Sequence, residues 1–69
     1  MVDWSMITNN IRRHMPLSRA AKIVGCEYQH IGRLARGEVD QPRFMTGVKL
    51  LDLHYDLEPE RHKSLIKKL

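Results

Sequence analysis

Gln29 and Arg33 lie one helical turn apart on a helix predicted for residues 27–36. At that spacing the two side chains share one face of the helix. A glutamine amide pairs naturally with adenine in the major groove of DNA, and an arginine guanidinium pairs with guanine. The pair is therefore a candidate for contacting base edges.

The surrounding residues predict two helices that cross at a tight turn. Such a unit needs a small residue where the helices touch, a residue that tolerates positive φ at the turn, and apolar anchors on the second helix. Ala21, Gly25, Ile31 and Leu34 meet these needs in that order. We expect a helix-turn-helix over residues 17–37.

The polar positions of this unit are candidates for the remaining DNA contacts. Tyr28 is expected at the wall of the groove, where it donates to a phosphate, contacts a thymine methyl group or is partly buried. Gly32 is expected to allow close approach to DNA, since glycine costs about 1 kcal/mol relative to alanine inside a helix. The expected phosphate contacts are Ser18, Arg19, Lys22, Arg36 and Arg43, the last with the alternative of holding an acid or a partner subunit.

The same motif resembles the repressor and Cro family of lambdoid phages, in residue type and in spacing. Gly37 ends the second helix as in that family, and Pro42-Arg43-Phe44 is similar to the start of the next helix in several members. The resemblance covers roughly residues 7–57. It implies a small all-α domain of four to five helices that binds a palindromic operator as a homodimer and represses transcription by occupying it.

Two positions depart from the family pattern. Many members have Gln where this chain has Leu17, and Ser or Thr where it has Glu27. Glu27 either contacts a cytosine amine or only caps the helix. Pro16-Leu17-Ser18 also resembles the opening of excisionase-type modules, which keeps an architectural DNA-binding role open.

Composition agrees with a small basic protein. The 69 residues suffice for one domain, residues 1–69, with a limited core. The net charge of +4 divides into +1 over residues 1–16, +3 over 17–37, −2 over 38–57 and +2 over 58–69. The positive charge thus peaks on the motif, as binding to DNA phosphates would require.

The sequence offers little for other chemistries. Cys26 is the single cysteine, so no intramolecular disulfide is expected, and there is no secretory signal or run of about 20 apolar residues. His14, His30, His54 and His62 match no common zinc spacing. We expect no metal, no cofactor, no small-molecule ligand, no enzymatic activity and no membrane association, and a location at the nucleoid in the cytoplasm of a bacterial host.

Helices outside the motif are expected to complete the core. The first is predicted from Asp3 to His14, with Trp4, Ile7, Ile11 and Met15 inward. A fourth is predicted to start near Thr46 and to bury Val48, Leu51 and Tyr55, and a last one to have Pro59 in its first turn.

Leucines beyond this core suggest a subunit interface. The apolar arc of the fourth helix looks too broad for one monomer, and Leu65, Ile66 and Leu69 form an apolar edge on the last helix. The candidate dimer contacts are Leu50, Leu53, Leu57, Leu65 and Ile66. The same surface motivates the alternative that the protein is an interaction module, such as an antitoxin or an adaptor.

Overall fold

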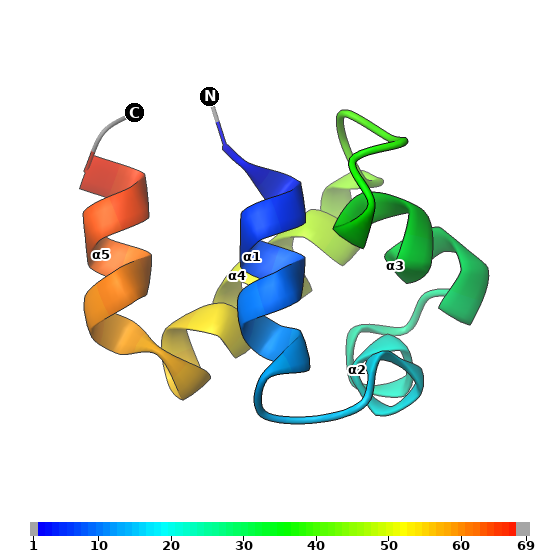
Figure 1. The fold of residues 1–69 in the computed structure, drawn as a ribbon, viewed down its shortest axis with the longest axis horizontal. Helices are drawn as coiled ribbons and strands as arrows, with labels where there is room; N and C mark the ends of the chain where they lie inside the picture. The colour runs from blue at the N-terminus through cyan, green and yellow to red at the C-terminus, as the bar shows by residue number, and fades with distance from the viewer. Residues whose placement is uncertain (1, 68–69) are drawn as a thin grey trace.

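Residues 2–67 are described by the computed structural model, with side-chain burial described through residue 64, and they form helices joined by short turns without any strand (Figure 1). The expected all-α fold is therefore confirmed for this part of the chain. The helices are α1 (Trp4–Arg12), α2 (Leu17–Val24), α3 (Tyr28–Ala35), α4 (Phe44–Leu57) and α5 (Pro59–Lys67).

Helix α1 begins after Asp3, whose carboxylate accepts a hydrogen bond from the Met6 amide at 3.1 Å. This satisfies one of the free amides of the first helical turn. The helix ends at Arg12, two residues before the predicted end, because the chain turns at residues 13–14 toward Pro16. Ile7 and Ile11 are buried as expected.

The turn between α2 and α3 has the predicted geometry. Gly25 adopts φ +76°, and the amides of Gly25 and Cys26 both donate to the Ala21 carbonyl, at 2.9 and 3.0 Å. A left-handed residue here closes α2 and redirects the chain at once into α3. Ala21, Ile31 and Leu34 are buried at the contact, so the helix-turn-helix core is as predicted.

The end of α3 is held by a residue from α1. The Asn9 side-chain amide donates to the carbonyl of Ala35 at 2.9 Å, which satisfies one of the free carbonyls of the last turn. Gly37 then adopts φ +75°, as expected for the residue that stops the helix. Helix α3 is thereby fixed at both ends on the rest of the fold.

Helix α4 differs from its prediction in start and in register. It begins at Phe44, two residues before the predicted start at Thr46, with Arg43 at the cap position, and Thr46 is buried inside the helix. Val48 and Tyr55 are exposed and Leu51 is only partly buried, so the predicted inner face is wrong. The buried residues of α4 are Thr46, Gly47, Leu50 and His54.

Packing against α1 explains this register. Apolar residues occupy several faces of α4, so the pattern alone does not select one. Gly47 lets the Trp4 ring approach closely, because a Cβ on Gly47 would lie 3.1 Å from Trp4 Cη2. His54 is buried at the same interface, where Asn10 supplies a hydrogen-bond partner.

The register also corrects the predicted dimer contacts. Leu50 is fully buried in the core of the monomer and is not available to a second subunit. Leu53 and Leu57 are partly buried against that core. The side chains of Leu65 and Ile66, and Leu69, lie outside the described part of the structure.

Helix α5 starts at Pro59, as predicted, and packs on α4. It lies at one end of the longest axis of the molecule, and α3 lies toward the other (Figure 1). No helix within residues 2–67 combines the length and the apolar character needed to cross a lipid bilayer.

Candidate nucleic-acid interface

Gln29 and Arg33 form an exposed ridge along α3. Both side chains are exposed, and both line each of two concavities that flank the helix. The helix is thus raised between two hollows, with the predicted base-contacting pair on its crest. This is the shape that a helix needs to enter a groove of DNA.

The first concavity, of about 440 Å³, lies between α3 and the start of α4. Arg43, at the cap position of α4, and Thr46 line it opposite Gln29, His30 and Arg33 of α3. Arg43 is exposed, so it adds a positive charge beside the ridge. The structure therefore brings the predicted phosphate contact Arg43 next to the predicted base contacts.

The second concavity, of about 420 Å³, lies on the other side of the ridge, between α3, the end of α1 and the start of α2. Arg12 and Leu17 line it opposite Tyr28 and Arg36. Tyr28 is 60% exposed, so most of its surface is open to a partner at this edge of the ridge. Each hollow thus holds an arginine from a helix other than α3.

Arg36 is paired within the protein. Its Nε donates to a Glu38 carboxylate oxygen, and this hydrogen bond raises the pKa of Arg36 and lowers the pKa of Glu38. Both side chains are exposed, so the pair is weak in water, and a phosphate can compete with Glu38 for the guanidinium. Arg36 remains a candidate phosphate contact only at the expense of this pair.

Gly32 is not the open position that was expected. It is buried, and a Cβ added to it would lie 3.2 Å from a guanidinium nitrogen of Arg36. The Arg36 side chain folds back over the glycine and covers it. Gly32 comes within reach of DNA only if Arg36 swings away.

The turn before α3 carries two polar residues with defined surroundings. Glu27 occupies the cap position of α3, but its side chain makes no capping hydrogen bond to the described residues. Burial raises the pKa of the neighbouring Cys26 thiol, and the Glu27 charge adds to the effect. The thiol is therefore held in its neutral form beside the first concavity.

His30 lines the first concavity with a buried ring nitrogen. Its Nε2 has no hydrogen-bond partner among the described residues. A buried polar atom without a partner costs about 1–3 kcal/mol, so this position is less stable than an apolar residue would make it.

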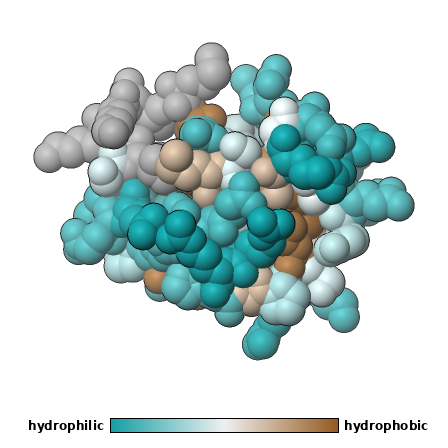
Figure 2. Space-filling view, in the orientation of Figure 1, coloured by the Kyte–Doolittle hydropathy of each residue, from teal (hydrophilic) through white to brown (hydrophobic). Residues whose placement is uncertain are grey.

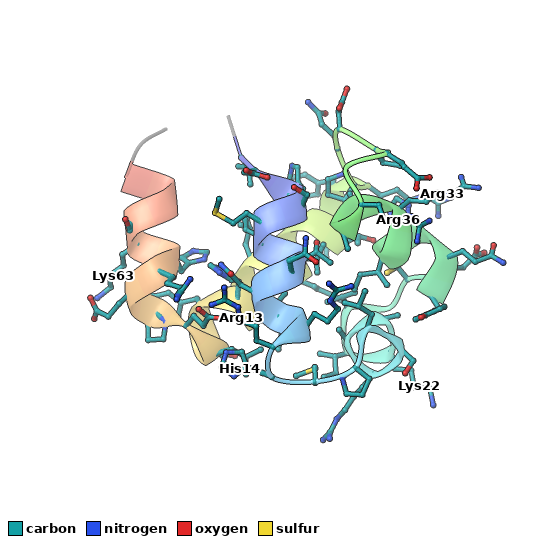
Figure 3. The ribbon with its side chains drawn as sticks, viewed as in Figure 1. Arg13, His14, Lys22, Arg33, Arg36 and Lys63 are labelled. Atoms are coloured by element: carbon teal, nitrogen blue, oxygen red, sulfur yellow. The ribbon has the colours of Figure 1, made fainter. Side chains whose placement is uncertain are left out.

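The polar residues of α2 lie apart from the ridge. Ser18, Arg19 and Lys22 are exposed, but within the described structure they line neither concavity. Figure 3 shows Lys22 extending from α2, at the same end of the molecule as Arg33 and Arg36.

Two basic residues of this surface were not predicted. Arg12 reaches the second concavity because α1 packs on α3. Lys49 of α4 lies at the helix-turn-helix turn, with its Nζ 3.8 Å from the position of a Cβ on Gly25. Both depend on contacts between helices distant in sequence, and no local pattern indicates them.

Within the described residues, no group of three or more His, Cys, Asp or Glu side chains is arranged to hold a metal ion. In comparisons with known proteins, no family model, curated protein or solved structure matches this chain.

Proposed function

We propose that this protein binds double-stranded DNA in a sequence-specific manner, with α3 in the major groove. The observation that carries the proposal is the ridge of Gln29 and Arg33 between two hollows that hold arginines. Gln29 contacts adenine and Arg33 contacts guanine. Tyr28 lies beside the ridge and contacts the groove wall.

The arginines of the two hollows supply the phosphate contacts. Arg43 lies on one side of the ridge, and Arg12 and Arg36 lie on the other. A helix in the major groove has a phosphate backbone along each side, so cations on both sides fix its position in the groove. Figure 2 shows that the face in view is largely hydrophilic, with apolar side chains near its centre and toward one edge.

The biological role that fits is a transcriptional regulator acting in the bacterial cytoplasm. A single recognition helix contacts few base pairs, and two copies on a palindrome about 34 Å apart contact successive major grooves. We therefore propose a homodimer on a palindromic operator, which represses by occluding a promoter. The helix-turn-helix spacing of Ala21 and Gly25, and the Pro42-Arg43-Phe44 segment, support this role through their resemblance to phage repressors and Cro proteins.

The test is selection of duplexes from a randomised pool, followed by sequencing and by anisotropy measurements on the enriched sites. We expect a palindromic site, and we expect Arg33→Ala to lose preference at one base pair per half-site. A bidentate contact contributes about 1–3 kcal/mol of discrimination, so the preference falls by about 5- to 150-fold. Circular dichroism checks that the exposed substitution leaves the helices intact.

Lys63→Ala is the matched control, because Lys63 is an exposed cation on α5 at the far end of the molecule (Figure 3). It should keep the preferences of the unmodified protein. Salt-sensitive binding without an enriched sequence would indicate an architectural, excisionase-like role. Absence of binding would reject the proposal.

An exposed apolar groove favours protein interaction as the second candidate function. Phe44 is 81% exposed, and with Trp4, Val48 and Leu51 it lines a groove of about 560 Å³ between α1 and α4. Exposed aromatic side chains of this kind are common at protein interfaces. If function survives Arg33→Ala but is lost in Phe44→Ser, the interaction module is the better description.

A further inference from the structure

Three of the four histidines meet at the end of the molecule opposite α3. His14 follows α1, His54 lies in α4 and His62 lies in α5. Together with Asn10 and Glu58 they form what we call the histidine junction. The DNA-binding proposal uses none of these residues.

His54 is the centre of the junction and is fully buried. Its Nε2 lies 3.1 Å from the side-chain amide nitrogen of Asn10, and its Nδ1 lies 3.0 Å from Nδ1 of His62. An amide nitrogen can only donate, so Nε2 of His54 accepts and its single proton is on Nδ1. His54 donates that proton to Nδ1 of His62, so Nδ1 of His62 carries no proton.

This arrangement leaves no place for a further proton on the two facing atoms. A proton on Nδ1 of His62 would point at the proton on Nδ1 of His54, and the hydrogen bond between α4 and α5 would be lost. A proton on Nε2 of His54 would point at the hydrogen atoms of the Asn10 amide nitrogen, unless the Asn10 side chain rotated to present its oxygen instead. The contact seen in the structure therefore requires both rings to be neutral.

The charged neighbours of His54 do little to stabilise a positive charge on its ring. Glu58 is the nearest acid, and its two oxygens are already engaged, by His14 at 3.0 Å and by Nε of Arg61 at 2.8 Å. The Tyr55 ring meets the edge of the His62 ring, with centroids 5.5 Å apart, and supplies no charge. Two imidazolium rings would stand 5.2 Å apart at their centroids, in mutual repulsion.

We propose that the histidine junction is a pH switch, which holds α5 on α4 while His54 and His62 are neutral and releases α5 when the pair takes up protons. The buried hydrophobic core described within residues 2–64 comes from α1 to α4, so release of α5 leaves the packing among these core residues in place. The contact of His14 with Glu58 at 3.0 Å does not involve α5, so it keeps the end of α4 beside the end of α1. The movement is confined to α5.

The direction of the pH effect follows from burial. Burial lowers the pKa of His54 below its ordinary value of 6.5, and the neighbouring His62 lowers it further. As the pH falls below 6.5, the released state binds a proton that the docked state excludes. Docking of α5 is therefore fully favoured above that pH and weakens below it.

The test is amide hydrogen exchange of the full chain at about pH 7.5 and about pH 5, corrected for the intrinsic pH dependence of exchange. Protection in α5 should fall by about 30-fold at the lower pH, because one proton excluded from the docked state weakens docking about tenfold per pH unit over the roughly 1.5 units below 6.5. Protection in α2 and α3 should not change. Equal protection of α5 at both pH values would overturn the proposal.

Variants assign the effect to the junction. His62→Gln should reduce the pH dependence of α5 protection, because it removes the repulsion between the two rings while burial still lowers the pKa of His54. His30→Gln, which changes the one histidine outside the junction, should retain the full pH dependence. Loss of α5 protection at low pH that is undiminished in His62→Gln would reject the proposed pair.

A second measurement needs no variant and follows the imidazole resonances of the unmodified protein by NMR. Protonation of His54 should occur over the same pH range as the loss of α5 protection. Protonation of His54 with α5 still docked would contradict the switch. None of these outcomes bears on DNA binding, so the two proposals fail separately.

Discussion

The positive charge beside the ridge comes from segments other than α3. Gln29 and Arg33 are exposed on α3, but Arg12 and Arg43 make the hollows beside them positively charged. The Arg36 side chain pairs with Glu38 and at the same time covers Gly32. In the proposed complex with DNA, affinity therefore comes from several cations, whereas specificity rests on two side chains.

Two glycines inside helices predict opposite effects of the same substitution. Gly32→Ala should raise the free energy of unfolding by about 0.5–1 kcal/mol, because alanine favours the helix and the exposed Arg36 side chain can move aside. Gly47→Ala should lower it by about 1–3 kcal/mol, because its Cβ would press on the packed Trp4 ring and on Pro42. Urea unfolding of the two variants measures both values, and a Gly47→Ala variant at least as stable as the unmodified protein would contradict the packing described for α4.

Helix α4 separates core and surface differently from what its sequence pattern suggests. Its buried residues face α1, while the large Phe44 and Met45 side chains at its start are exposed. Leucines of this helix therefore stabilise the monomer, and the exposed aromatic belongs to the apolar groove. The choice of inner face is made by the Trp4 and Asn10 contacts from α1.

This arrangement predicts a clear contrast along α4. Leu50→Ala should lower the free energy of unfolding by about 2–5 kcal/mol, because it leaves a cavity at a fully buried site. Phe44→Ala, which removes a larger but exposed side chain, should change it by less than about 0.5 kcal/mol. Thermal unfolding with size-exclusion chromatography distinguishes the two; a stable Leu50→Ala variant of altered oligomeric mass would restore Leu50 as an interface residue.

The molecule as a whole carries its two proposed activities at opposite ends. The ridge on α3 lies at one end of the long axis and the histidine junction lies at the α5 end (Figure 1). Helix α1 extends between them, with Asn9 capping α3 and Asn10 contacting His54. The Asn9 contact does not involve α5, so the α3 end, which we propose binds DNA, should stay folded when α5 is released.

Salt dependence provides a test of the electrostatic part of the site. Each phosphate contact that is lost should reduce the slope of log K against log salt by about 0.9. We expect this reduction in Arg43→Ala and in Arg12→Ala, one from each concavity, and no reduction in Lys63→Ala. Anisotropy titrations at several salt concentrations measure the slopes, and an unchanged slope in Arg12→Ala would remove the second concavity from the interface.

Local features of this fold were accessible from the sequence. Gly25 and Gly37 were correctly predicted to adopt positive φ, and the buried faces of α2 and α3 followed from their apolar spacing. These features depend on residues within a few positions of each other, where backbone conformation and helical periodicity are decisive.

Contacts between distant segments were decided by packing. The position of Arg12 beside α3, the burial of Leu50 and the meeting of His54 with His62 join residues of different helices. An amphipathic pattern shows which face of a helix is apolar, but it does not show which neighbour covers that face. In α4 the apolar residues occupy several faces, so only the fit of Gly47 to Trp4 and of His54 to Asn10 selected the one that is buried.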